Sequence, residues 1–379
     1  MEQPPPLPLP PSQLPESIRR FGDPAGPLPA RTMAAKGLVP VKGTDLVTLL
    51  IQLTRDAEPS VAAAAEQTMV GLPEGILLAA CAAPLHPSVL DALADRCGRS
   101  GAALEAVVSN SVTADSTIRR VARMCAESIT EMISSNEQRL IGAPAIIEAL
   151  YMNSNTRMST ADRLIELAAR HELRLDAIPA YEAHVRAIQG QLIPEPSDEP
   201  MPGDIGFREA LAHDEDDPDA IERDAVDGTE TLKRKFTQLR QQIGGMTDSE
   251  KIRMAMVGSA AARAILIRDP RREIADAAAR GIKSDREAAN IAMSREVGED
   301  ILRLIGSRKR WLSNYEVKKA LVLNPKTPVA IALQFLTHLR DSDLRALSRS
   351  RNVAGPIKSA ASMRYQQKTR SSGKGGGRG

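Results

Sequence analysis

The chain has 379 residues, of which 42% are hydrophobic and 26% charged but only 2% aromatic. A core with so few rings must be built from Ala, Leu, Ile, Val and Met, which favours closely packed helices over an aromatic-rich β-sandwich. Three cysteines are too few for a disulfide framework, and no apolar run reaches the ~18–20 residues of a membrane span. The composition therefore predicts a soluble, cytoplasmic, all-α protein of two or three domains.

The net charge of +2 conceals a strong asymmetry along the chain. Residues 231–379 carry 31 Lys+Arg and 13 Asp+Glu, a net of +18, whereas residues 1–230 have a net of −16. An asymmetry of this size indicates a polyanionic partner or contact between the two halves. The alternative is that the cations only form a solvated helical face.

Proline marks the beginning of the chain. Residues 1–40 contain 11 of the 26 prolines, which predicts a disordered, extended arm. Residues 41–192 then show short amphipathic segments, and several of these have proline in the first helical turn: Pro59, Pro73, Pro87 and Pro144. We expect an N-terminal block of short helices in this region.

Residues 193–230 differ from both flanks. Between residues 195 and 230 there are 14 acids and two arginines, too little apolar surface to offset chain entropy, so we expect a disordered acidic linker. Residues 231–362 form a basic helical block with three capping-box pairs: Thr247 with Glu250, Ser284 with Glu287, and Ser313 with Glu316. Residues 363–379 are rich in Arg, Lys, Gly and Ser and are expected to be a disordered tail.

A repeat of about 28 residues runs through the basic block. Glu296, Asn324 and Asn352 lie in three similar turns, each followed by a helical stretch, and Asn110, Asn136 and Asn153 mark a looser version upstream. Asparagine suits such turns because its side chain caps helices and tolerates left-handed backbone angles. One pair of short helices cannot bury its apolar face alone, so the repeat predicts α-solenoid stacking of helix pairs in two blocks.

Part of this repeat resembles a known group of proteins. Asn324-Pro325-Lys326-Thr327-Pro328, before a Leu-bearing helix, is similar to the Asn-Pro-x-Thr-Pro turn of HEAT-like and leucine-rich-variant bacterial α-solenoids. The similarity is good over residues 253–361, fainter over 44–175, and absent elsewhere; Asn153-Ser154-Asn155-Thr156 is an echo that lacks both prolines. The resemblance implies a solenoid that serves as a binding surface.

Catalytic and metal-binding motifs are not found in the sequence. Cys81, Cys97 and Cys125 are separated by 16 and 28 residues without a C-x-x-C pair, so we interpret them as buried structural thiols. The five histidines are isolated, no nucleotide-binding or nucleophile-elbow motif occurs, and the acidic run 214–217 lacks the spacing of a calcium loop. We expect no catalytic residue, metal or cofactor.

Cations near the C-terminal turns are the most prominent candidate site. If corresponding turns align along one edge of a solenoid, they would form a stripe that binds an anionic partner: Arg308, Lys309, Arg310, Lys318, Lys319, Lys326, Arg349, Arg351 and Lys358. The leading hypothesis is a non-enzymatic scaffold that binds an acidic protein surface. The alternative is sequence-tolerant, salt-dependent binding of a nucleic-acid backbone, although only Trp311 and Tyr315 lie in the stripe to stack on bases. A third hypothesis is that the acidic linker contacts the basic block and competes with its ligand.

Overall fold

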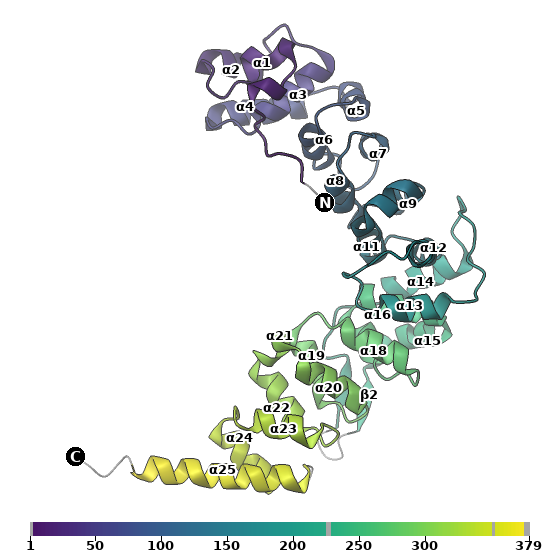
Figure 1. Cartoon of the computed structure of the whole chain (residues 1–379), viewed down its shortest axis with the longest axis vertical. Helices are drawn as coiled ribbons and strands as arrows, with labels where there is room; N and C mark the ends of the chain where they lie inside the picture. Colours follow the sequence, from purple (N-terminus) through teal and green to yellow (C-terminus); the bar gives the residue numbers. More distant parts are fainter. Residues whose placement is uncertain (1–2, 225–228, 351–352, 375–379) are drawn as a thin grey trace. The chain divides into compact units, whose positions relative to one another are not determined.

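The computed structural model describes residues 3–224, 229–350 and 353–374 (Figure 1). The chain forms two compact units, Met1–Ala177 and Ile178–Gly379. The described residues are helical apart from one two-stranded sheet, as the composition predicts. The division falls at residue 177, ahead of the acidic segment, so that segment belongs to the second unit and does not separate two helical blocks.

The first unit consists of short helices joined by tight turns. After the 3-10 turn η1 (Pro11–Gln13) its helices are α1 (Glu16–Gly22), α2 (Leu28–Ala35), α3 (Gly43–Leu53), α4 (Pro59–Val70), α5 (Glu74–Ala82), α6 (Pro87–Ala94), α7 (Ala102–Ser109), α8 (Asp115–Ala122), α9 (Glu127–Ser134), α10 (Glu137–Gly142), α11 (Pro144–Met152) and α12 (Met158–Arg170). Within this unit α5 packs on α7, and α8 packs on α11. Pro59, Pro87 and Pro144 lie in the first turns of α4, α6 and α11, as the sequence predicts, whereas Pro73 is the N-cap of α5.

The second unit adds a small β-hairpin to the same kind of helix. Its helices are α13 (Tyr181–Ile188), α14 (Pro202–Ala212), the 3-10 turn η2 (Arg234–Phe236), α15 (Thr237–Gly245), α16 (Asp248–Val257), α17 (Ala260–Leu266), α18 (Arg272–Arg280), α19 (Asp285–Met293), α20 (Glu299–Ser307), α21 (Lys309–Leu312), α22 (Tyr315–Leu323), α23 (Val329–Leu336), α24 (Asp341–Arg349) and α25 (Gly355–Lys374). Strands β1 (Ile221–Arg223) and β2 (Glu230–Leu232) pair antiparallel, with Ile221 opposite Leu232.

The proline-rich start of the chain is folded, in contrast to the disordered arm that its composition predicts. It contains η1, α1 and α2, and Leu9 and Ile18 are completely buried. Gln52 of α3 holds the backbone of the extended segment, because its Nε2 donates to the Leu9 carbonyl oxygen at 2.7 Å and its Oε1 accepts from the Leu9 amide at 2.8 Å. Leucines between the prolines supply the buried surface, and Gln52 satisfies backbone groups that proline-rich chain cannot pair with itself.

The acidic segment and the tail are also more ordered than expected. The predicted linker contains α14 and β1, and Phe207 of α14 is buried with its ring 5.1 Å from the buried Arg253 guanidinium. At the C-terminal end α25 continues to Lys374 and packs on α23 and α24, with Ile357 and Ala361 buried. The described part of the chain has no helix whose length and hydrophobicity would let it span a bilayer.

Three asparagines make the same buried turn. Asn110, Asn153 and Asn324 follow the last residues of α7, α11 and α22, and each is at most 9% exposed. Each Nδ2 donates to two backbone carbonyls at the end of the helix packed alongside. The acceptors are Cys81 (3.0 Å) and Ala83 (2.8 Å) for Asn110, Ala122 (2.9 Å) and Cys125 (3.0 Å) for Asn153, and Ala292 (2.7 Å) and Ser294 (2.7 Å) for Asn324. The carbonyls at the end of a helix lack partners within that helix. When a second helix packs alongside, the asparagine that follows the second helix provides the missing hydrogen-bond donor.

The same turns correct the register of the repeat. Each asparagine Oδ1 accepts from the amide two residues later, and the residue three positions later is a buried threonine: Thr113, Thr156 or Thr327. In the preceding turn the equivalent place belongs to Ser294, whose Oγ accepts from the Glu296 amide, so Ser294 and not Glu296 corresponds to Asn324. Asn136 has a different role as the N-cap of α10, and Asn352 lies outside the described residues.

Candidate anion-binding surface

Three consecutive cations lie at one corner of the second unit. Arg308 connects α20 to α21, and Lys309 and Arg310 are the first residues of α21. The Arg310 guanidinium donates to the Lys283 carbonyl oxygen at 3.1 Å, which places the turn before α19 at the same corner. We call Lys283, Arg308, Lys309 and Arg310 the corner cluster. It lies at the N-terminal ends of two helices that pack together, α19 and α22.

Trp311 anchors this corner. Its side chain is 2% exposed, and the Arg308 guanidinium lies 5.5 Å from the ring centroid, a cation–π distance. Asn314 then caps α22, because its Oδ1 accepts from the Glu316 amide at 2.8 Å; the predicted cap, Ser313, instead donates to the Arg310 carbonyl. With Trp311 buried, Lys309 and Arg310 of the same short helix are left exposed to solvent.

The four cations of the corner cluster differ in their electrostatic surroundings. No ion pair joins Arg308, Lys309 or Arg310 to a carboxylate in the described parts of the chain. Burial lowers the pKa of Lys283 and the nearby Arg263 charge lowers it further, whereas Glu287, Asp216 and Asp214 oppose the shift. The Lys283 Nζ donates to the Gly258 carbonyl oxygen at 3.2 Å. Arg263 itself is neutralised by Glu287, with contacts of 2.5 and 3.0 Å. Half-buried Arg308 and exposed Lys309 and Arg310 therefore lack a carboxylate partner among the described residues.

The other predicted cations do not extend this cluster into one stripe. Lys326 lies in the turn after α22 and Lys309 lies in α21 before it, so the full length of that nine-residue helix, about 13 Å, lies between the two positions. Lys319 pairs with Asp343 at 3.0 Å, and the Asp343 hydrogen bond raises the pKa of Lys319. The remaining cations are dispersed: Lys318 on α22, Arg349 at the end of α24, Lys358 on α25, and Arg351 outside the described residues.

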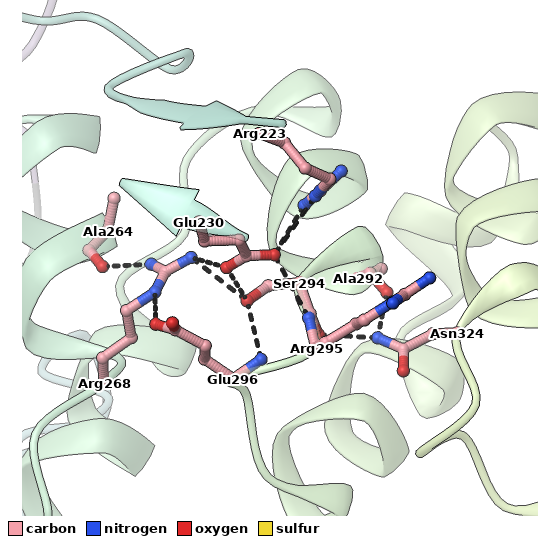
Figure 2. A network of polar contacts seen from close by, with 9 residues as sticks. All are labelled: Arg223, Glu230, Ala264, Arg268, Ala292, Ser294, Arg295, Glu296 and Asn324. Atoms are coloured by element: carbon pink, nitrogen blue, oxygen red, sulfur yellow. Dashed lines mark hydrogen bonds and ion pairs between the residues drawn. The ribbon is translucent and has the colours of Figure 1, made fainter. Parts of the chain in front are cut away.

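Glu230 at the start of β2 is the centre of a buried polar network (Figure 2). Its carboxylate is 1% exposed and contacts Arg268 at 2.7 Å and Arg223 at 2.9 Å. It also accepts from Ser294 Oγ at 2.6 Å and from the Arg295 amide at 3.2 Å. Burial alone would raise the pKa of Glu230, but the hydrogen bonds from Ser294, Arg268 and Arg223 outweigh it and hold the pKa below its ordinary value.

The Arg268 guanidinium contacts several groups of this network. Its guanidinium contacts Glu230, Glu296 (3.0 Å) and Ser294 Oγ (3.1 Å), and it also donates to the Ala264 carbonyl oxygen (Figure 2). Glu296, predicted as a repeat-turn residue, therefore serves as a carboxylate partner. These contacts occupy four of the five N–H donors of Arg268 and pair its charge with two carboxylates, so it is not a free cation for an external anion.

Earlier in the acidic segment, two aspartates bind the amides at the start of α17. The Asp214 carboxylate accepts from the Ser259 amide at 2.5 Å and from the Ser259 hydroxyl, and Asp216 accepts from the Ala260 amide at 3.1 Å. Burial raises the pKa of Asp214 even though these hydrogen bonds oppose it. A carboxylate at a helix N-terminus satisfies free amides and complements the helix dipole. The acidic run 214–217 is thus part of the folded unit rather than a solvated linker.

The same segment neutralises cations of the following helices. Asp219 pairs with Arg286, and its other carboxylate oxygen accepts from Asn290 Nδ2 at 2.7 Å. Asp217 pairs with Lys233 at 3.0 Å. Together with Glu230 on Arg268, these contacts bring acids of the segment onto α17, α19 and the hairpin. No carboxylate in the described part of this segment pairs with Arg308, Lys309 or Arg310, whereas the charges of Asp214 and Asp216 reach Lys283.

A cavity of about 390 Å³ lies beside the hairpin, with hairpin, α15, α16 and α17 residues in its wall. Its lining holds three cations (Arg240, Lys251 and Arg268) and three acids (Glu230, Asp269 and Glu296). Two of the cations are paired, Lys251 with Asp269 at 3.2 Å and Arg268 with Glu230 and Glu296. The described residues contain no cluster of three or more His, Cys, Asp or Glu side chains that would hold a metal ion. A balanced lining of this kind does not select an anion.

Sequence reasoning missed the residues that organise this unit. The sequence predicts a disordered linker around Glu230, and it relates the turns at Asn110 and Asn153 to that at Asn324 without identifying their shared Asn-x-x-Thr pattern. The signal was present, because Asn110 with Thr113 and Asn153 with Thr156 have the same spacing as Asn324 with Thr327.

The comparisons with known proteins are negative: no protein-family model matches this sequence, and no curated protein matches it.

Proposed function

We propose that this protein is a non-enzymatic cytoplasmic scaffold, in which each unit is a short α-solenoid and the corner cluster binds an acidic surface of a partner protein. The stacking is supported by the asparagine turns, each of which ties a helix end to the neighbouring helix. The observation that carries the binding proposal is the contrast in charge pairing. Acids of segment 214–230 pair with Arg268 and Arg286, whereas Arg308, Lys309 and Arg310 have no carboxylate partner in the described residues.

A protein surface fits the cluster better than a nucleic-acid strand. The four cations gather at one corner, whereas a phosphate backbone needs cations at regular intervals along a track. Lys326 and Arg349, which would extend such a track, lie elsewhere: Lys326 follows the end of α22, and Arg349 is the last residue of α24. The one tryptophan is buried, so it does not offer a face on which a base could stack.

Affinity capture with the full-length chain tests this proposal. The bait would be compared with a triple charge-reversal variant, Arg308→Glu/Lys309→Glu/Arg310→Glu, in extracts treated with nuclease. We expect a reproducible protein partner on the unaltered bait and its loss from the variant. With that partner purified, we expect the variant to raise Kd about tenfold or more, equivalent to about 1.4 kcal/mol, and the affinity to fall with salt.

The matched control reverses three exposed cations of the first unit that have no partner in the described residues, Lys36→Glu/Lys42→Glu/Arg55→Glu. It makes the same change in net charge and should leave the captured partner bound. Equal loss from both variants would contradict a defined docking surface. Loss of all captured protein on nuclease treatment, with duplex DNA or RNA bound at physiological salt, would replace the proposal with nucleic-acid binding.

A further inference from the structure

Two of the three cysteines face each other in the first unit. Cys81 lies in the last turn of α5 and Cys97 in the turn after α6, and their Sγ atoms are 4.0 Å apart, within sulfur hydrogen-bond distance. Cys81 is completely buried, whereas Cys97 is half-buried. The third thiol, Cys125, is buried and contacts Asn153 Nδ2 at 3.8 Å. The sequence predicts three buried structural thiols; Cys81 and Cys125 are buried, whereas Cys97 is only half-buried and lies against Cys81.

The backbone around Cys97 can bring the sulfurs closer. A disulfide requires an Sγ–Sγ distance of about 2.05 Å, so the two sulfurs must approach by about 2 Å. Cys97 lies in the connection between α6 and α7, which contains Gly98 at φ +71° and Gly101 at φ +107°. A Cβ at either glycine would meet no atom within 4 Å, so this connection has room to move.

The environment of the pair also separates the roles of the two thiols. The hydrogen bond from Cys81 lowers the pKa of Cys97, and the same bond together with burial raises the pKa of Cys81. Thiolates are the nucleophiles in thiol oxidation, and a reactive cysteine combines thiolate character with access to solvent. Cys97 meets both conditions, and Cys81 lies where a resolving thiol must be.

We propose that Cys81 and Cys97 form a reversible disulfide, with hydrogen peroxide as the oxidant. The Cys97 thiolate attacks one peroxide oxygen: an S–O bond forms, the O–O bond breaks, and hydroxide leaves and takes up a proton to become water. The Cys81 sulfur then attacks the Cys97 sulfenic acid: the S–S bond forms, the S–O bond breaks, and the leaving hydroxide takes the Cys81 proton. In sum, two thiols and one peroxide give one disulfide and two waters.

The position of the pair links oxidation to the repeat architecture. The Cys81 carbonyl is one of the two acceptors of Asn110 Nδ2, at 3.0 Å, and Ala83 provides the other at 2.8 Å. A disulfide would tie this helix end to the connection that leads into α7, whose last residue precedes Asn110. The dithiol pair thus lies directly against the first asparagine turn.

Peptide mapping of the native, full-length protein tests the proposal. Cleavage after Lys and Arg separates the thiols, with Cys81 in peptide 56–96, Cys97 in 97–99 and Cys125 in 124–139. After treatment with a few equivalents of hydrogen peroxide and alkylation of free thiols, we expect one cross-linked species, 56–96 with 97–99, and alkylated Cys125. The alkylated thiols should fall from three to one per chain and return to three with dithiothreitol.

Two variants keep the test decisive. In Cys81→Ser, Cys97 should be trapped as a sulfenic acid that reacts with dimedone, whereas Cys125→Ser should still form the cross-link. Circular dichroism would establish that each variant is folded before oxidation. Three free thiols after peroxide, a Cys97–Cys125 cross-link, or oxidation of Cys97 to the sulfinic acid without a link to Cys81 would each overturn the proposal.

Discussion

Replacing Asn324 by alanine would remove the side chain that pairs two buried carbonyl oxygens, those of Ala292 and Ser294, each 2.7 Å from Nδ2. It would also remove the acceptor of the Lys326 amide. A buried polar group left without a partner costs about 1–3 kcal/mol, so the two carbonyls together predict a loss of about 3 kcal/mol. Because about 1.4 kcal/mol changes an equilibrium constant tenfold, this loss predicts that the equilibrium constant for local opening of α19 and α22 rises about 150-fold.

Native-state hydrogen exchange on the full-length protein measures this effect, because it reports local opening without requiring the whole chain to unfold as one unit. The matched control is Asn314→Ala at the other end of α22, where the side chain caps the helix by accepting from the Glu316 amide at 2.8 Å. Loss of a cap costs about 1 kcal/mol, or about fivefold in exchange. If the amides of α19 exchange no faster in Asn324→Ala than in Asn314→Ala, the asparagine does not link the two helices as we argue.

Further predictions concern the acidic network and two glycines. Glu230→Gln would leave Arg268 without its buried counter-charge and should lower the free energy of unfolding by about 3 kcal/mol, measured by urea denaturation. Because the folded pKa of Glu230 lies below its ordinary value, its stabilisation is present above about pH 4.3 and lost as the pH falls through the folded pKa; the acid limb of the stability curve should flatten in Glu230→Gln, and an unchanged limb would contradict this assignment. Gly281→Ala should destabilise by about 2 kcal/mol or more, because a Cβ there collides with the Ala255 carbonyl oxygen where α18 meets α16, and a wild-type melting temperature would argue against this close approach. Gly206→Ala, inside α14 with nothing within 4 Å, should instead stabilise by about 0.5–1 kcal/mol.

The helical character of the chain was predictable because it rests on local rules. A proline in a first helical turn and a capping box act within a few residues of sequence. Pro87, Pro144 and the Thr247–Glu250 capping box all lie in the structure where the sequence predicts them. The turn at Asn324 was also identified, since Asn-x-x-Thr is a local pattern. Its exact register was not, because the preceding turn uses Ser294, which substitutes a hydroxyl for the amide.

The order of the proline-rich and acidic segments was not predictable from composition. Leu9 is ordered by Gln52, 43 residues away, and Asp214 by Ser259, 45 residues away. Composition measures whether a segment can fold alone, whereas these segments fold by contributing partners to groups that other helices leave unsatisfied. The charge pairing of the predicted cations was hidden for a related reason: the sequence shows Lys319 as a cation near Arg310, but Asp343 of another helix pairs with it in the structure.

The β-hairpin restricts where the second unit can be cut into fragments. Glu230 and Arg223 face each other across the two strands. Cleavage or truncation at Thr231, where the charge changes sign along the chain, would therefore divide the hairpin and remove the buried carboxylate partner of Arg268, leaving only the more exposed Glu296. A piece beginning there would display cationic groups that the intact protein conceals, and would bind polyanions for reasons unrelated to its biology. Fragments that begin at residue 178 keep the carboxylates that pair with these cations. Their binding to polyanions therefore reflects the surface of the intact unit.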